Sequence, residues 1–169
     1  TMALVPQVVD AVKIPVIAAG GIADGRGYVA ALALGAIGVQ VGTCLLVADE
    51  CPIHENYKQA ILDAKDTDTV VTGRSVSAPV RIKKNAMSQK YIKLEHAGAV
   101  RDDLEKLTLG SLRKAVFDGD MENGSVMMGQ IAGMIKERKT LAQIFADMTS
   151  SAKDIYQKIE ANVNGDDNA

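Results

Sequence analysis

The chain has 169 residues, a formal net charge of −2 and 47% hydrophobic residues, which suits one globular domain or part of a larger one. No dominant basic face is needed to explain this composition, so nucleic acid is not expected as the main partner. No apolar run approaches the roughly 20 residues of a membrane span, no signal-peptide pattern opens the chain, and two cysteines cannot form a disulfide framework or a four-cysteine zinc site. We therefore expect a cytoplasmic protein without a membrane segment or a metal site.

The first part of the chain predicts a strand–turn–helix–strand unit. The apolar run 14–19 is typical of a buried parallel strand, which is covered on both faces. Asp24 is the predicted N-cap of a helix over 28–34, and Gly35 ends that helix. A second strand is predicted over 38–43.

Both predicted strands end in residues whose backbone can approach a ligand closely. Glycine has no Cβ, so its N–H group can face an anion without a steric penalty. Two adjacent parallel strands that end in this way describe the phosphate site after strands 7 and 8 of a (β/α)8 barrel. A plain strand-to-helix turn is the alternative, and the second glycine-ended strand argues against it. The predicted phosphate-binding residues are Gly20, Gly21, Gly42 and Thr43, and the predicted ligand-binding edge also includes Ala19, Gln40 and Val41.

Beyond residue 50 the pattern becomes mostly helical. Helices are predicted from Cys51-Pro52 to about 65 and over 86–96, 104–117 and 140–163, with a short strand over 69–72 and an extended or irregular stretch over 80–85. Two strands cannot close a barrel, so we expect an α/β fold that is the C-terminal part of a (β/α)8 TIM barrel. The predicted domains are the barrel part (1–66), an inserted capping or substrate domain (67–136), a C-terminal helix that returns to the barrel (137–163) and a disordered tail (164–169).

Residues 14–25 together with 40–43 resemble the flavin-binding signature of the nitronate monooxygenase superfamily. Within it, the chain is most similar to the FMN-dependent enoyl-[acyl carrier protein] reductase II group. The stretches that carry this closer similarity are 54–58, 78–81 with 84–85, and 124–133. The resemblance extends from residue 1 to about residue 159.

The resemblance implies FMN, whose phosphate the predicted residues would hold, and NADH or NADPH as the reductant. The implied reaction reduces a trans-2-enoyl thioester on acyl carrier protein in bacterial type II fatty acid synthesis. The family's active-site histidine would lie upstream of Thr1, and neither His54 nor His96 matches it, so no catalytic residue is expected here. The implied partners are the N-terminal part of the same enzyme, the carrier-bound substrate and a second copy in a homodimer.

Met127, Met128 and Gln130 are expected to line the flavin face or the acyl pocket. Methionine suits a pocket for variable acyl chains because its side chain is flexible and polarizable. Ordinary core packing is the alternative for this stretch.

A basic cluster at Arg81, Lys83 and Lys84 is interpreted as a dock for the acidic carrier protein. A solvated surface is the alternative, as is a role for Arg81 at the pocket or the nicotinamide phosphates. Two alternative functions also stay open, a nitronate monooxygenase with the same fold and FMN, and a catalytically silent structural fragment. The sequence leaves open NADH versus NADPH, acyl length, oligomeric state and the role of Cys44.

Overall fold

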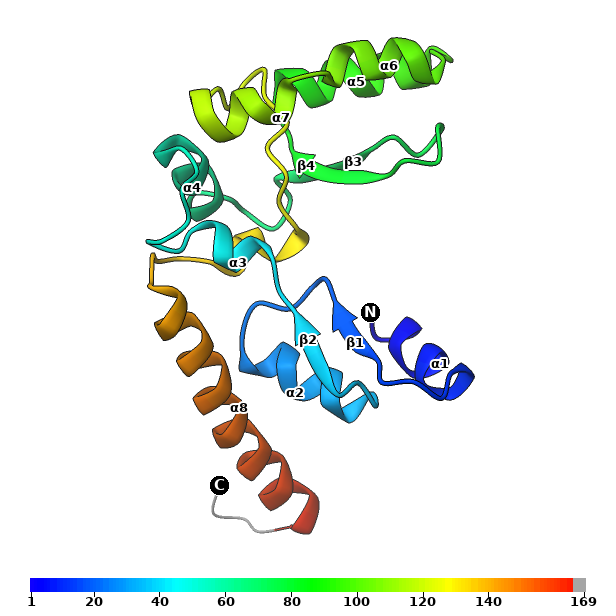
Figure 1. The fold of residues 1–169 in the computed structure, drawn as a ribbon. Coiled ribbons are helices and arrows are strands. Elements are labelled where there is room, and N and C mark those ends of the chain that lie inside the picture. The colour runs from blue at the N-terminus through cyan, green and yellow to red at the C-terminus, as the bar shows by residue number, and fades with distance from the viewer. Residues whose placement is uncertain (166–169) are drawn as a thin grey trace. The chain divides into compact units, whose positions relative to one another are not determined.

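The computed structural model describes residues 1–165, and the chain divides into two compact units (Figure 1). Unit 1 consists of Thr1–Glu50 and Arg138–Ala169, and unit 2 of Cys51–Glu137. The predicted boundary at residue 66 falls inside unit 2, while the boundary after residue 136 lies beside the observed division. The identity of the two units as barrel part and cap stays a prediction. Of the predicted tail, residues 166–169 lie outside the described residues.

Unit 1 is built around two short parallel strands, β1 (Ile17–Ala19) and β2 (Gly38–Gln40). The two strands pair with Ala19 opposite Gln40, so their carboxyl ends lie side by side. This arrangement confirms the predicted strand–helix–strand order. The helices of unit 1 are α1 (Leu4–Ala11), α2 (Gly25–Ala33), α3 (Thr43–Leu46) and α8 (Leu141–Asn164).

The core of unit 1 lies on one face of the two strands. Ala18 is 2% exposed and packs with Val5 of α1 and Ala31 of α2. Ile17, which points to the opposite face, is 52% exposed. The sequence predicted burial on both faces, but among the described residues of unit 1 only the Ala18 face is covered.

Helix α2 begins where the sequence predicts its cap. The Asp24 carboxylate accepts hydrogen bonds from the backbone N–H groups of Arg26, at 3.0 Å, and Gly27. The hydrogen bond from the Arg26 side chain, together with these backbone bonds, holds the pKa of Asp24 below its ordinary value, although partial burial acts in the opposite direction. Asp24 is therefore ionised at neutral pH, and its negative charge stabilises the helix by its position near the positive end of the helix dipole.

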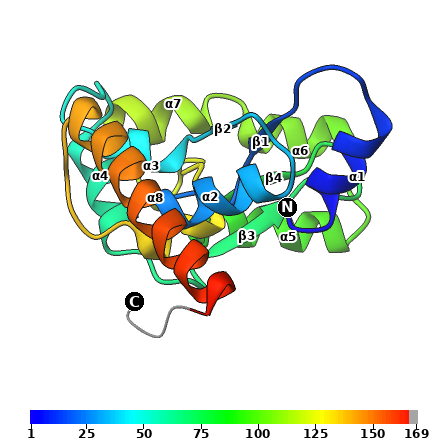
Figure 2. The ribbon, with the colours of Figure 1, turned by 90° about the horizontal axis from the view of Figure 1, so that it is seen from below.

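Helix α8 packs along α2, as Figure 2 shows. Gly25 lies at the point of closest approach. A Cβ on Gly25 would lie only 2.6 Å from the backbone nitrogen of Ala152 and 2.9 Å from the carbonyl oxygen of Met148. The glycine after the Asp24 cap is therefore required for close helix packing.

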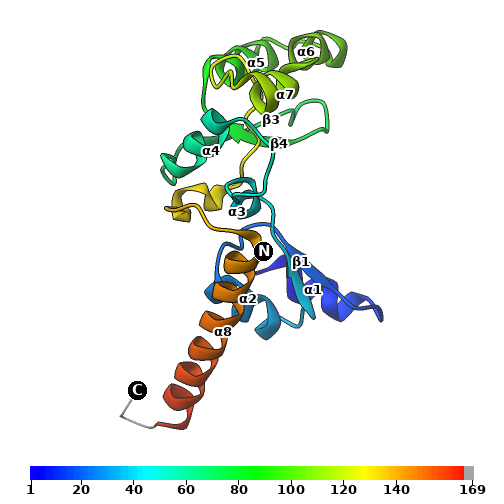
Figure 3. The ribbon, with the colours of Figure 1, turned by 60° about the vertical axis from the view of Figure 1, so that its left-hand side comes forward.

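Unit 2 combines an antiparallel hairpin with several helices, and Figure 3 shows α5 and α6 side by side. The buried side chains of Ile82, Met87, Tyr91 and Leu104 form a core shared by the hairpin and these helices. The elements of unit 2 are α4 (Glu55–Leu62), β3 (Thr69–Thr72), β4 (Val80–Lys83), α5 (Ala86–His96), α6 (Arg101–Thr108), α7 (Ser111–Arg113), a π-helical turn η1 (Lys114–Asp118) and a 3₁₀ turn η2 (Gln130–Met134).

Two helix predictions in unit 2 are wrong at their ends. The helix predicted from Cys51-Pro52 begins at Glu55, because His54 is its N-cap and accepts the N–H of Asn56 at 3.1 Å through Nδ1. The helix predicted over 104–117 begins at Arg101 and breaks at Gly110, whose φ of +75° is left-handed. The stretch over 80–85 contains strand β4, so unit 2 is not helical throughout.

A buried asparagine joins the start of α5 to a distant loop. Asn85 is 5% exposed and forms a capping box with Ser88, in which its Oδ1 accepts the Ser88 N–H at 2.9 Å. Its side-chain amide also donates to the carbonyl oxygens of Met121 and Gly124, each at 2.8 Å. One side chain therefore satisfies backbone groups on two segments that are far apart in the sequence.

Tyr57 gives unit 2 a predictable pH dependence. Its side chain is 2% exposed and its hydroxyl donates to the carbonyl oxygen of Met127 at 2.7 Å. Burial raises the pKa of Tyr57 from 10.0 to about 12. Ionisation of Tyr57 is therefore harder in the folded state than in the unfolded state. The resulting contribution to the free energy of unfolding is fully present below pH 10 and is lost as the pH rises through about 12.

We expect the Tyr57→Phe variant to lose about 1–2 kcal/mol of unfolding free energy at neutral pH, because the Met127 carbonyl loses its donor. The wild-type free energy should fall by about 3 kcal/mol across the alkaline range, and the variant should lack this fall. Denaturant unfolding as a function of pH measures both effects. Tyr156→Phe is the matched control, since Tyr156 is 60% exposed, and an alkaline profile equal in all three proteins would contradict the prediction.

Candidate functional site

The predicted phosphate-binding residues meet at one edge of unit 1. Because β1 and β2 are parallel and Ala19 pairs with Gln40, the turns that follow them begin side by side. Gly20 and Gly21 both have left-handed backbone, with φ of +87° and +79°. The first turn therefore requires glycine at both positions on conformational grounds.

Open space lies in front of both glycine-ended strands. A Cβ on Gly20 or Gly42 would meet no atom of the described chain within 4 Å, and one on Gly21 would meet only the hydroxyl of Thr1, at 3.5 Å. The same hydroxyl donates to the Gly20 carbonyl at 3.1 Å, which orients this turn. This edge is an exposed backbone cradle that a Cβ would partly fill, as a site for a phosphate requires.

The second turn leads directly into a short helix. Gly42 precedes α3, and its carbonyl accepts the N–H of Leu45 at 2.8 Å. Gln40 is exposed at the end of β2, whereas Val41 and Thr43 are half-buried. The turn thus presents backbone and one amide side chain at the strand edge.

Cys44 lies directly after this edge as a buried side chain. Its side chain is 5% exposed, and burial raises the pKa of the thiol. A thiol that stays protonated is a poor nucleophile. Its burial at the start of α3 favours a packing role for Cys44.

The three residues predicted to line the substrate pocket lie in different surroundings within unit 2. Met127 borders a pocket of about 270 Å³. Met128 is 3% exposed and packs inside the unit, which matches the core-packing alternative, and Gln130 is exposed at the first position of η2. The substrate-pocket role of all three residues stays a prediction.

The two histidines and the basic cluster occupy defined positions. His54 caps α4, as described above, and His96 lies in the last turn of α5. Arg81 and Lys83 alternate with buried Ile82 along β4, so they share the face of the hairpin opposite the core. Arg81 also donates to the Thr69 hydroxyl at 2.9 Å.

Within residues 1–165 no three histidine, cysteine or acidic side chains come together in a way that could hold a metal ion. Over the same residues, no helix combines the length and apolar character needed to cross a membrane.

Comparison with known proteins places this arrangement in a wider group. Residues 1–151 match the family model described as nitronate monooxygenase. A Staphylococcus saprophyticus protein named probable nitronate monooxygenase is 39% identical over 144 residues, which are 85% of this chain and 41% of that protein. The chain therefore spans about two fifths of the length of this curated relative.

Two solved structures share the fold. FabK from Thermotoga maritima superposes with a TM-score of 0.91 at 43% identity, covering 96% of this chain and 51% of FabK. Nitroalkane oxidase from Streptomyces ansochromogenes superposes with a TM-score of 0.78 at 28% identity, covering 94% of this chain and 45% of that enzyme. Both are α/β enzymes, so the α/β architecture predicted from the sequence is confirmed, whereas its completion to a barrel is not tested by the two strands present.

Proposed function

This chain belongs to the nitronate monooxygenase family, and we propose that it supplies the phosphate-binding edge of an FMN-dependent oxidoreductase. The proposed reaction is the reduction of a trans-2-enoyl thioester on acyl carrier protein, with NADH or NADPH as the reductant, in bacterial fatty acid synthesis. The remaining strands of the barrel would come from the rest of the enzyme. Exposed Ile14, Ile17 and Ile37, at 72%, 52% and 64%, offer the apolar surface that such strands would cover.

The residues at the strand edge fit the phosphate of FMN. The backbone N–H groups of Gly20, Gly21 and Gly42 would hold the phosphate, and the exposed amide of Gln40 would orient the adjoining chain of the cofactor. When bound, FMN supplies the hydride chemistry, and the protein supplies position and electrostatics. The observation that carries this assignment is the open space before both glycines at adjacent strand ends.

The substrate assignment is supported by the similarity to FabK, while a Staphylococcus aureus protein named probable nitronate monooxygenase is 42% identical over 132 residues. The chain is 43% identical to FabK, an enoyl-[acyl carrier protein] reductase II, but 28% identical to nitroalkane oxidase. Nitronate oxidation is the second candidate, because the curated relative carries the name probable nitronate monooxygenase. The two reactions differ in the electron acceptor, which is an enoyl thioester in one and oxygen in the other.

One experiment on the full-length enzyme separates these candidates. Oxidation of NADH and of NADPH is followed without oxygen in the presence of crotonyl thioester, and oxygen uptake is followed separately with a nitronate. We expect thioester-dependent oxidation of one nicotinamide cofactor. Oxygen uptake with the nitronate, together with no thioester reduction, would replace the enoyl assignment by nitronate oxidation.

The basic cluster supplies a test of the proposed carrier-protein partner. Reversing the charge at Lys83 and Lys84 should raise the Michaelis constant for carrier-bound substrate severalfold, because exposed pairs contribute about 0–1 kcal/mol each and steer association together. The constant for a small thioester should stay nearly unchanged. Steady-state kinetics at low and high salt measure the effect.

Lys158→Glu is the matched control, since Lys158 is exposed on α8 and carries the same charge. Docking at this cluster would be ruled out if the Lys83 and Lys84 variants changed the Michaelis constants for both substrates equally. It would also be ruled out if Lys158→Glu raised the Michaelis constant for carrier-bound substrate as much as they do.

A further inference from the structure

Unit 2 contains a pocket of about 270 Å³ between the β3–β4 hairpin and the helices α5, α6 and α7. All of its lining residues belong to unit 2, and none of them is a predicted phosphate-binding residue. Of the three residues predicted to line the substrate pocket, Met127 is the one that lines this cavity.

Several apolar side chains in the walls of the pocket are exposed to solvent. Val80, Leu112 and Met127 line it and are 37%, 40% and 39% exposed. Buried Ile82 and Met87 complete the apolar wall. Concave apolar surface of this kind is typical of a site for a small molecule.

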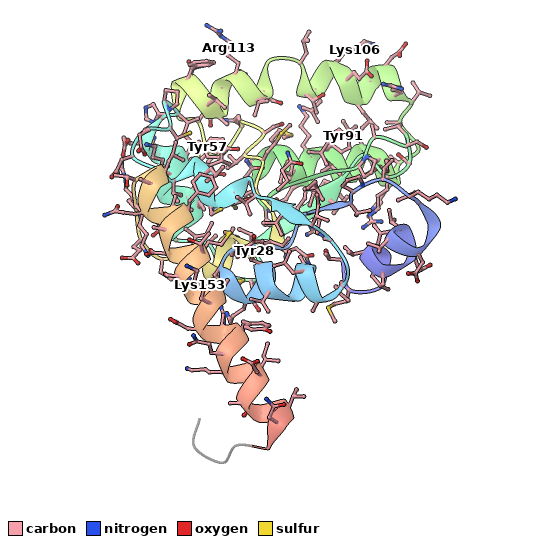
Figure 4. All side chains as sticks on the ribbon, turned by 60° about the horizontal axis from the view of Figure 1, so that its bottom comes forward. Tyr28, Tyr57, Tyr91, Lys106, Arg113 and Lys153 are labelled. Atoms are coloured by element: carbon pink, nitrogen blue, oxygen red, sulfur yellow. The ribbon has the colours of Figure 1, made fainter. Side chains whose placement is uncertain are left out.

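One polar group in the pocket has no partner. The Tyr91 side chain, labelled in Figure 4, is 7% exposed and lines the pocket, yet no residue among 1–165 hydrogen-bonds its hydroxyl. Among the described residues no buried side-chain oxygen lacks a partner, so the Tyr91 hydroxyl reaches solvent through the pocket and is free to donate to a ligand acceptor.

The other hydroxyl groups of the lining have hydrogen-bond partners, and its two charged side chains pair with each other. At the exposed mouth, the Arg101 guanidinium pairs with the Glu105 carboxylate at 2.6 Å, which cancels the charge there. Inside, the hydroxyls of Ser111 and Ser125 bond each other at 2.6 Å. The pocket therefore presents apolar walls, one free hydroxyl donor inside and a paired arginine and glutamate, without net charge, at its mouth.

We propose that this pocket binds a neutral, mostly apolar molecule with one hydrogen-bond acceptor, which the Tyr91 hydroxyl engages. A cavity of 150 Å³ accommodates benzene, so this pocket suits a molecule of about ten heavy atoms. Binding of such a molecule does not rest on the proposed enoyl reduction, but its identification with the acyl part of the substrate does. Two sources share this chemistry, the acyl part of the enzyme's own thioester substrate and a separate neutral metabolite.

The test uses octanamide as the probe and the full-length, FMN-loaded enzyme, with binding measured by calorimetry. Octanamide should bind saturably, and octanoate, which has the same chain but a charge, should bind at least about tenfold more weakly. Tyr91→Phe should weaken octanamide binding about three- to tenfold. It should leave the melting temperature unchanged, because the hydroxyl makes no hydrogen bond within the described chain. Tyr156→Phe, at an exposed tyrosine of unit 1, is the matched control and should bind like the wild type.

A second variant tests the position of the site. Val80→Phe places a larger side chain in the pocket and should abolish octanamide binding, while the flavin content of both variants stays at the wild-type level. The proposal is overturned by absence of saturable binding, or by equal octanamide affinity in the wild type and Tyr91→Phe. Competition between octanamide and the thioester identifies the substrate as the source, and binding without competition identifies a separate metabolite.

Discussion

Replacing Gly42 with alanine or valine should remove FMN from the full-length enzyme without unfolding it. A Cβ at this position meets no atom of the described chain within 4 Å, and the φ of −128° lies outside the left-handed region. The added atoms would therefore occupy only the space proposed for the phosphate. Charge-assisted hydrogen bonds contribute about 1.5–3 kcal/mol each, so the loss of two should weaken FMN binding about a hundredfold or more.

The measurement is the visible absorbance of bound flavin in the purified variant, together with its thermal melt. Gly38→Ala is the matched control, because a Cβ there meets the Ile17 side chain at an ordinary 3.4 Å at the other end of β2. Gly20 is a poorer test, since its φ of +87° strains any other residue. Full flavin occupancy in Gly42→Val would sink the phosphate assignment.

Replacing Asn85 with alanine should lower the free energy of unfolding by about 3–5 kcal/mol. The loss of a helix N-cap costs about 1 kcal/mol, and each buried carbonyl left without a donor costs about 1–3 kcal/mol. Asn85 is 5% exposed and serves two such carbonyls, those of Met121 and Gly124. Denaturant unfolding measures the change.

Asn85→Asp separates the cap from the two amide bonds. Aspartate keeps the acceptor that caps α5, but its carboxylate cannot donate to the carbonyls of Met121 and Gly124. We therefore expect the free energy of unfolding of Asn85→Asp to fall by at least the contribution of the two amide hydrogen bonds. A loss of about 1 kcal/mol in Asn85→Ala, with none in Asn85→Asp, would show that only the cap matters.

Local signals explain which elements the sequence predicts well. Asp24 and Gly35 border α2 because both act through backbone groups only a few residues away. The adjacency of the two glycine turns also follows from local information, since consecutive parallel strands joined by a helix place their carboxyl ends together. The break at Gly110 was missed because the residues on both sides continue an apolar helical pattern, and a single glycine is tolerated in many helices.

The contacts of Asn85 could not be predicted from the motif that contains it. The residue belongs to a stretch that carries the similarity to an enzyme family. In the structure its side chain is buried and bonds a loop almost forty positions later in the chain. A pattern of residue types contains no record of such a partner.

The sequence by itself determined the strand–helix–strand unit, the glycine-ended strand edge and the family resemblance, because these depend on short-range backbone preferences and on a contiguous motif. Only the tertiary structure decided which of the two buried tyrosines has a hydrogen-bond acceptor for its hydroxyl. Tyr57 donates to a carbonyl seventy positions away, whereas Tyr91 lines a pocket and has no such acceptor within residues 1–165. Both are tyrosines on apolar helix faces, and the difference lies in long-range contacts that form only when the chain folds.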